Sequence, residues 1–483
     1  MKKLLTISVV LSSLLNAFSP FDKVNTNDNQ INRTTNLVQA SNTINNSNRY
    51  KTTLERVEIL ENELNKLKSH INDNEEYTEE VEGNLDDLTT KVLKNNRIGF
   101  TRLKFDSTVH NFIYTTADGV KHTNKNVATS NLKMDLETKI SSKLTFRGQL
   151  AMYKFWAQGN NYPYSNYDNM EGRVPSNSSL YVTRAYIDWK AISGNIPVTF
   201  TIGRQPSSSG PSWQYSNNGV RYGTYDALVF DGNADGIVAT IGIKTSSIRL
   251  AYGKGYQNNT FSTSQSGVKD NNVLGLFIDN KIPTIKNSFL QLYATIAKDI
   301  STGNANLGDI SWFGGMFELN NISNFDFFAH YSISKTSPNG TLTTMEDGSK
   351  MGLLTNINGD TSTKTGQAFW IGTRYSFQSK AKLGLEYGKG SQNWINMTQG
   401  SDNILNPRST RGTVIDIYGI YPIDKSIGVN AFIKVGSTMI DYDYSGSGMP
   451  YGTPMKISDN MGGYETKITD KINNFYVDFQ VNY

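Results

Sequence analysis

The chain of 483 residues has no cysteine and a formal net charge of +4, and it is rich in glycine (41), tyrosine (26) and phenylalanine (22). The lack of cysteine excludes disulfide bonds and cysteine-ligated zinc or iron–sulfur sites. Lys and Arg are not clustered densely enough for a nucleic-acid footprint, so we expect no nucleic-acid partner. The glycine and aromatic content favours long antiparallel strands over helices.

Residues 1–17 have the order of a secretory signal peptide. Lysines precede an apolar run that ends at Leu15, and small residues up to Ala17 follow. The run is too short to span a membrane as a helix, and we expect cleavage after Ala17. A buried first helix is the alternative. Residues 18–50 are rich in Asn, Thr and Ser and predict a flexible linker.

Residues 51–95 carry apolar side chains at steps of three and four. A single heptad frame holds Val57, Leu60, Leu64, Leu67, Ile71, Val81, Leu85, Leu88 and Val92, and only Asn74 and Thr78 interrupt it. One helix cannot bury such a seam alone, so the pattern predicts a periplasmic coiled coil that joins a homo-oligomer, and a trimer would suit a porin. The alternative is an amphipathic helix packed on the barrel mouth or on another envelope component.

From residue 97 onward the apolar period changes to two. Leu132, Met134 and Leu136 alternate with Lys133 and Asp135, for example. This alternation predicts strands. We expect sixteen, with eighteen as the alternative count, at 97–110, 128–138, 143–155, 179–190, 196–205, 234–244, 247–255, 272–281, 286–299, 309–320, 323–336, 365–377, 380–390, 411–421, 426–440 and 472–483.

The connections between these strands are expected to alternate strictly between long and short. The short ones include 139–142, 191–195, 245–246, 321–322, 378–379 and 422–425, and the long ones include 156–178, 206–233, 256–271, 337–364, 391–410 and 441–471. Tight turns at one end and long loops at the other are typical of outer-membrane barrels. We therefore predict an all-β membrane fold, a single antiparallel transmembrane barrel over residues 97–483. A soluble β-sandwich is the alternative, but it does not require this regularity.

The C-terminal strand alternates most clearly. Its apolar face comprises Phe475, Val477, Phe479, Val481 and Tyr483, and the residues between them are mostly polar. A chain that ends on an aromatic residue in such a strand carries the signal that barrel-assembly machinery reads. We predict insertion into the outer membrane of a Gram-negative bacterium, with lipid around the barrel.

The long connection from Arg204 to Gly236 is the candidate for a pore constriction. It contains prolines that stiffen its path and charges of both signs. Opposed charges across a narrow passage set its size limit and selectivity. The candidate constriction residues are Arg184, Arg204, Arg221, Asp226, Asp231 and Asp235. An ordinary external loop with solvated charges is the alternative.

We expect no catalytic residue, cofactor or metal. The stretch from Asp231 to Gly236 matches half of an EF-hand loop, but the position of the bidentate Glu is occupied by Gly242. A hydrolase would need a Ser/His pair, and His330 has only Ser332 and Ser334 near it on the same strand face. Same-strand neighbours rarely form a working pair.

Several short segments resemble those of an uncharacterised, domain-of-unknown-function family of bacterial proteins interpreted as outer-membrane porins. They are Gly203 to Ser207, Gly210-Pro211, Gly223-Thr224, Trp312 to Gly315, Lys335 to Gly340, Gly390 to Gln392, Arg411-Gly412 and Asp441 to Gly448. The resemblance covers most of residues 97–483 and implies a porin-type barrel with a signal peptide and an N-terminal coiled coil. It assigns no substrate. This chain departs from the family at Gln205 and Tyr225, and its Asn-rich linker is longer.

These features together predict a porin-like channel through which small hydrophilic solutes diffuse passively. Residues 1–96 hold 11 Lys and Arg and 14 Asp and Glu, which leaves 36 and 29 for residues 97–483, a net charge of +7. This excess suggests a weak anion preference. The competing hypothesis is a structural or adhesive barrel, closed by its own loops, that anchors the envelope through the coiled coil.

Overall fold

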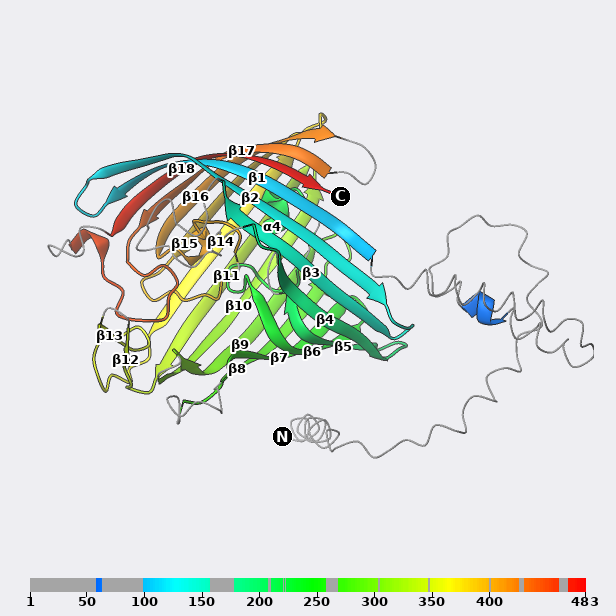
Figure 1. Cartoon of the computed structure of the whole chain (residues 1–483), viewed down its shortest axis with the longest axis horizontal. Coiled ribbons are helices and arrows are strands. Elements are labelled where there is room, and N and C mark those ends of the chain that lie inside the picture. The colour runs from blue at the N-terminus through cyan, green and yellow to red at the C-terminus, as the bar shows by residue number, and fades with distance from the viewer. Residues whose placement is uncertain are drawn as a thin grey trace, which may run out of the picture. The chain divides into compact units, whose positions relative to one another are not determined.

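The computed structural model describes residues 58–62, 99–156, 178–206, 210–219, 221, 223–257, 268–302, 305–345, 348–398, 401–424, 430–459 and 468–483. Sixteen strands form one closed barrel, and each pairs antiparallel with both neighbours (Figure 1). The predicted strand count is confirmed, and each predicted range overlaps one barrel strand.

The barrel strands follow one another around the ring in chain order. They are β1 (Gly99–Thr116), β2 (Lys121–Lys139), β3 (Leu144–Phe155), β4 (Tyr181–Ile192), β5 (Val198–Pro206), β6 (Asn233–Ile243), β7 (Ser246–Tyr256), β8 (Asn271–Lys281), β9 (Phe289–Ser301), β10 (Asn306–Ile322), β11 (Phe325–Pro338), β14 (Thr365–Ser376), β15 (Lys382–Gly390), β16 (Gly412–Asp424), β17 (Asn430–Tyr442) and β18 (Thr469–Asn482). A small separate hairpin, β12 (Thr343–Thr344) with β13 (Lys350–Met351), lies in the connection after β11.

The first and last strands close the ring. Their register runs from Lys104 opposite Asn482 to Thr116 opposite Thr469. The C-terminal residue adds one more pair of backbone hydrogen bonds, because Leu103 N donates to Tyr483 O at 2.7 Å and Tyr483 N donates to Leu103 O at 2.8 Å. The barrel therefore leaves no free strand edge at this seam, which removes a site of edge-to-edge aggregation.

The two faces of each strand differ in polarity and exposure, because successive side chains of a strand point to opposite sides. In β18, Phe475, Val477 and Phe479 are 49%, 39% and 41% exposed, whereas Tyr476 and Asp478 between them are buried. Exposed leucines, isoleucines and aromatic residues continue this outer apolar face around the ring, for example Leu274 and Leu276, Leu383 and Leu385. The polar side chains Asn474, Asp478 and Gln480 of β18 consequently face the lumen.

Two connections depart from the predicted strict alternation. Only residues 117–120 join β1 to β2, and only residues 302–305 join β9 to β10, although both lie at the end where the other connections are long. The first is short because β1 and β2 extend beyond the predicted bounds. Tyr114 and His122 stack there, with ring centroids 4.9 Å apart, and extend the paired strands.

Long loops fold inward and form an apolar core inside the ring. Tyr215, Leu228 and Phe230 of the connection after β5 and Trp394 and Ile395 of the connection after β15 are buried. They belong to one cluster with the inward-facing wall residues Phe277, Tyr293, Trp312, Phe328 and Trp370. The lumen is therefore partly filled by the protein's own loops.

Residues 58–62, which include Leu60, are helical. The rest of the predicted coiled coil over 51–95, the signal peptide and the linker lie outside the described residues, so these remain predictions. No helix in the described part of the chain is long and apolar enough to cross a membrane.

Candidate pore constriction

The connection between β5 and β6, residues 207–232, crosses the lumen and is called the crossing loop below. Lys382 Nζ, on β15, donates a hydrogen bond of 2.6 Å to Asn218 Oδ1 of this loop. In the ring order, β15 is eight strands from β5 in either direction, so it lies opposite the strand from which the loop departs. The structure therefore places the predicted constriction loop across the barrel.

A short helix, α4 (Trp213–Ser216), fixes the tip of the crossing loop to the far wall. Glu318 on β10 accepts hydrogen bonds from Ser212 N at 3.0 Å and from Gln214 Nε2 at 2.6 Å. Arg374 Nη1 on β14 donates to Tyr215 O at 2.8 Å. Charge-assisted bonds of this kind are the stronger class of hydrogen bond, so the loop tip is well held.

The returning half of the crossing loop is anchored by Asp226. This carboxylate is fully buried and lies 2.5 Å from His330 Nδ1. It also accepts hydrogen bonds from Tyr293 Oη at 3.1 Å and from Leu228 N at 2.8 Å. Three partners satisfy a carboxylate that would otherwise be costly to bury.

Arg221 forms another attachment. Its Nη2 lies 3.2 Å from Asp279 Oδ2 on β8, and its guanidinium carbon lies 3.7 Å from the ring centre of Phe289. Burial lowers the pKa of the Arg221 guanidinium, and the Asp279 carboxylate opposes that shift. The side chain therefore holds the loop to the wall through an ion pair and a cation–π contact.

The connection between β15 and β16, residues 391–411, lies against the crossing loop and is called the cover loop. Met397 N donates to Val229 O at 2.7 Å, and Asp231 N donates to Met397 O at 2.9 Å. Arg408 Nη2 donates to Ser212 Oγ at 2.8 Å, and its guanidinium carbon lies 3.7 Å from the ring centre of Trp213. Burial lowers the pKa of the Arg408 guanidinium. The two loops thus form one bonded partition.

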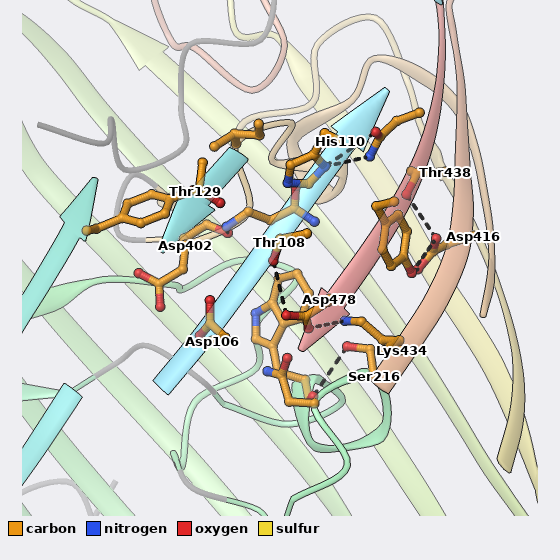
Figure 2. Close-up of a pocket in the computed structure, with 18 of the residues that line it drawn as sticks. Asp106, Thr108, His110, Thr129, Ser216, Asp402, Asp416, Lys434, Thr438 and Asp478 are labelled. Carbon is orange, nitrogen blue, oxygen red and sulfur yellow. Dashed lines mark hydrogen bonds and ion pairs between the residues drawn. The ribbon is translucent and has the colours of Figure 1, made fainter. Parts of the chain in front are cut away.

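Beside this partition lies a polar cavity of about 120 Å³, bounded by β1, β2, β3, β16, β17, β18 and the two loops (Figure 2). Thr108 Oγ1 donates to Asp478 Oδ1 at 3.1 Å, and Lys434 Nζ lies 3.6 Å from Asp478 Oδ2. Figure 2 shows these three side chains, from β1, β18 and β17, directed toward one another. The adjacent Asp416 accepts a hydrogen bond of 2.9 Å from Thr438 Oγ1.

The polar cavity carries more acidic than basic side chains. Its lining contains five aspartates and two lysines, namely Asp106, Asp231, Asp402, Asp416, Asp478, Lys104 and Lys434. Asp402 of the cover loop additionally pairs with Lys133 of β2. The side chains that line the polar cavity therefore carry an excess of formal negative charge.

The structure separates the candidate constriction residues into four groups. Arg184 and Arg221 line a hollow of about 240 Å³ with Arg147 and Glu137, and Asp231 lines the polar cavity. Asp226 is buried as a loop anchor.

Arg204 and Asp235 bond to each other at 2.8 Å and are solvent-exposed. They share the strand face of the outward-facing Ile202 and Ile237, so they lie outside the lumen.

Sequence reasoning missed most of the cavity lining. Lys104, Asp106, Asp416, Lys434 and Asp478 all occupy inward strand positions, where charged residues alternate with apolar ones. That alternation is visible in the sequence and marks each as a lumen residue. Their convergence on one cavity depends on ring closure, which pairs β1 with β18, the neighbour of β17.

His330 also differs from its expected surroundings. Ser332 Oγ donates to Phe313 O and Ser334 Oγ donates to Asn393 O, so each hydroxyl is hydrogen-bonded to a backbone carbonyl. The partner of His330 is Asp226, 104 positions earlier in the chain, which no local pattern indicates. The described contacts therefore place His330 in the anchor of the crossing loop.

The family model described as "Protein of unknown function (DUF3373)" matches residues 121–483. The chain belongs to this family. The resemblance inferred from the short motifs is thereby confirmed over residues 121–483, while β1 and the N-terminal coiled coil lie outside the match. No curated protein matches the chain.

Solved structures similar to this chain include two outer-membrane proteins. Salmonella typhi OmpF, in a complex with daunomycin, is 12% identical with a TM-score of 0.45; the alignment covers 80% of this chain and 98% of OmpF. The trimer form of in-vitro-folded OmpT from Vibrio cholerae is 13% identical with a TM-score of 0.41, over 79% of this chain and 99% of OmpT.

Proposed function

We propose that this protein is a porin-like channel of the Gram-negative outer membrane through which small hydrophilic solutes diffuse passively. The observation that carries the proposal is the crossing loop, which reaches the opposite wall and leaves a cavity lined by ionisable side chains beside it. A narrow passage with charged walls admits hydrated solutes and limits their size. The belt of exposed apolar residues on the outer face supports a lipid environment.

The proposed channel has a weak preference for positively charged solutes. The net charge of +7 on the barrel suggested an anion preference, but selectivity depends on the charges that line the narrow part of a channel. Five aspartates and two lysines line the polar cavity, so we replace the anion preference with a cation preference.

Swelling of protein-containing lipid vesicles in isotonic solutes tests this function. Small sugars should enter and cause swelling, and a small organic cation should enter faster than an anion of the same size. Asp478→Asn should reduce this difference, whereas Asp235→Asn, on the outer face, should leave it unchanged. Absence of swelling with every solute would refute the channel, and faster anion entry would refute the cation preference.

A second candidate function is a structural barrel closed by its own loops, which anchors the envelope through its periplasmic segment. The apolar core that the crossing and cover loops build inside the ring favours it. The same vesicles discriminate the two functions, because a closed barrel inserts and folds without admitting solutes.

Residues 51–95 are proposed to join copies of the chain, with three as the number that suits a porin. Recognition of the C-terminal strand by barrel-assembly machinery is proposed from the alternation that ends at Tyr483. Deleting 51–95 should loosen or abolish the oligomer in sedimentation experiments. An equally stable oligomer after the deletion would show that barrel contacts suffice.

A further inference from the structure

A second and larger cavity lies between strands β4–β9 and the two inner loops. Its volume is about 660 Å³. The inward-facing wall side chains are Val238, Ala251, Val273, Phe277 and Thr295, and the loop side chains are Tyr225, Phe230 and Met397. It is called the apolar cavity here because nearly all of these side chains are apolar. The charged Arg204, Asp235 and Lys254 also border the cavity, but they share the strand faces of the exposed Ile202, Ile237 and Tyr252 and point away from the lumen. The cavity extends to the strand ends that carry the long loops, where Pro206 and Asn233 border it.

The apolar lining belongs to the inner face of the barrel. Leu274 and Leu276 of β8 are exposed on the outer face, so Val273 and Phe277, at the alternate positions of the strand, point inward. The ring of Phe277 meets Tyr225 edge-on at 4.6 Å and Phe230 edge-on at 5.8 Å between centroids. Wall and loop therefore present aromatic rings to the same space.

This lining is unlike that of the polar cavity on the other side of the partition. A passage for hydrophilic solutes gains nothing from an apolar wall, because water against apolar surface is unfavourable. A purely structural core would be close-packed, since protein interiors contain few voids larger than a water molecule. A cavity of about 660 Å³ in the midst of aromatic rings fits neither description.

A polar group in the wall gives a second, independent observation. Thr295 lines the apolar cavity, is 5% exposed, and its Oγ1 has no hydrogen-bond partner among the described residues. Buried hydroxyl groups nearly always have a partner. A ligand with one donor or acceptor would supply it.

We infer that the apolar cavity binds small neutral molecules that combine an aromatic or aliphatic body with one hydrogen-bonding group, such as an aromatic alcohol. Small-molecule sites typically measure roughly 300–1,000 Å³ and are lined by apolar and aromatic side chains with a few polar groups. The aromatic rings contact the body of the ligand, and Thr295 contacts its polar group. This inference goes beyond the channel function and does not depend on it.

Engineered cysteines test the site cleanly, because the chain has no cysteine of its own. Val273→Cys places a thiol in the apolar cavity, and Thr108→Cys places one in the polar cavity as a matched control. Both changes nearly preserve side-chain volume. Each variant, reconstituted in lipid vesicles, is treated with neutral N-phenylmaleimide or with a cationic methanethiosulfonate, and the rates of modification are measured.

The ratio of neutral to cationic rate should be at least about tenfold higher at Val273→Cys than at Thr108→Cys, because an apolar cavity excludes charge. Benzyl alcohol, the probe ligand, should slow modification of Val273→Cys several-fold and leave Thr108→Cys unaffected. Filling the cavity by adding Ala251→Phe to Val273→Cys should abolish this protection. Equal ratios at the two thiols, or equal effects of benzyl alcohol on both, would overturn the inference even if the Ala251→Phe protein failed to fold.

Discussion

Lys382 on β15 holds Asn218 at the tip of the crossing loop, with 2.6 Å between Lys382 Nζ and Asn218 Oδ1. The contact joins a loop that leaves β5 to the strand diametrically opposite. Asn218 also exchanges two hydrogen bonds with Asn430 on β17. The tip of the loop is thus bonded to two strands of the far wall, and the proposed channel function predicts that the width of the passage depends on these bonds.

Asn218→Gly should release the tip and raise the single-channel conductance. Glycine suits this position because the φ angle of Asn218 is 47°. A hydrogen bond to a charged group contributes about 1.5–3 kcal/mol. Its loss should therefore make the state in which the tip is detached from the wall about ten times more populated or more. Asn126→Gly, where φ is 57° and the side chain is exposed, is the matched control. Identical conductance in both variants would mean that the tip does not limit the passage.

Asp226→Ala should loosen the returning half of the crossing loop. The change leaves Tyr293 Oη and His330 Nδ1 without their acceptor inside the protein. Each buried group left unsatisfied costs about 1–3 kcal/mol. Hydrogen exchange of the loop amides should accelerate by about tenfold or more, whereas Asp118→Asn in the exposed β1–β2 connection should change nothing. Unchanged exchange in Asp226→Ala would show that Asp226 does not anchor the loop.

The stability of the crossing loop should fall in strongly alkaline solution. Burial raises the pKa of Tyr225 to about 12 from its ordinary value of 10.0. The unfolded chain therefore loses this proton at lower pH than the folded chain, so the contribution of Tyr225 to stability is complete below pH 10 and declines as pH rises through about 12. The measurement is the protection of the crossing-loop amides from hydrogen exchange. Tyr225→Phe should make this protection decline less steeply between pH 10 and 12. An identical pH profile in the variant would count against burial of this phenol.

Tyr483→Asp should impair insertion more than Asn482→Asp. Tyr483 completes the outer apolar face of the terminal strand and bonds to Leu103 at the seam. A carboxylate there would face lipid, which costs far more than a carboxylate at the neighbouring lumen-facing position. The yield of folded barrel, measured by heat-dependent gel mobility, distinguishes the two. Equal yields would remove the terminal aromatic residue from the insertion signal.

The strands were predictable because period-two alternation is local. Each barrel strand can be read from residues such as Leu132, Lys133 and Met134 without knowledge of its neighbours. Connection lengths were less predictable, because strands can extend past the apolar run. Tyr114 and His122 continue the β1–β2 pairing in a segment with no clear alternation.

The constriction was only partly predictable for a physical reason. A loop sequence shows that charges are present but does not show what they contact. Each of the partners Glu318, Arg374 and Lys382 lies more than 100 positions after the loop residue that it contacts. Arg204 and Asp235 were misplaced although the predicted strands 196–205 and 234–244 already include them, because they were counted with the loop charges and not with the strand faces. The strand alternation then sets their direction, and it points them outward.

Planar-bilayer recording of the folded, full-length chain in a potassium chloride gradient tests the central claim most directly. A passage beside the crossing loop predicts stepwise current increments, and the five aspartates of the polar cavity predict a reversal potential that indicates weak cation selectivity. Folded protein that inserts but gives no stepwise current at any applied voltage would contradict the claim that the lumen is open.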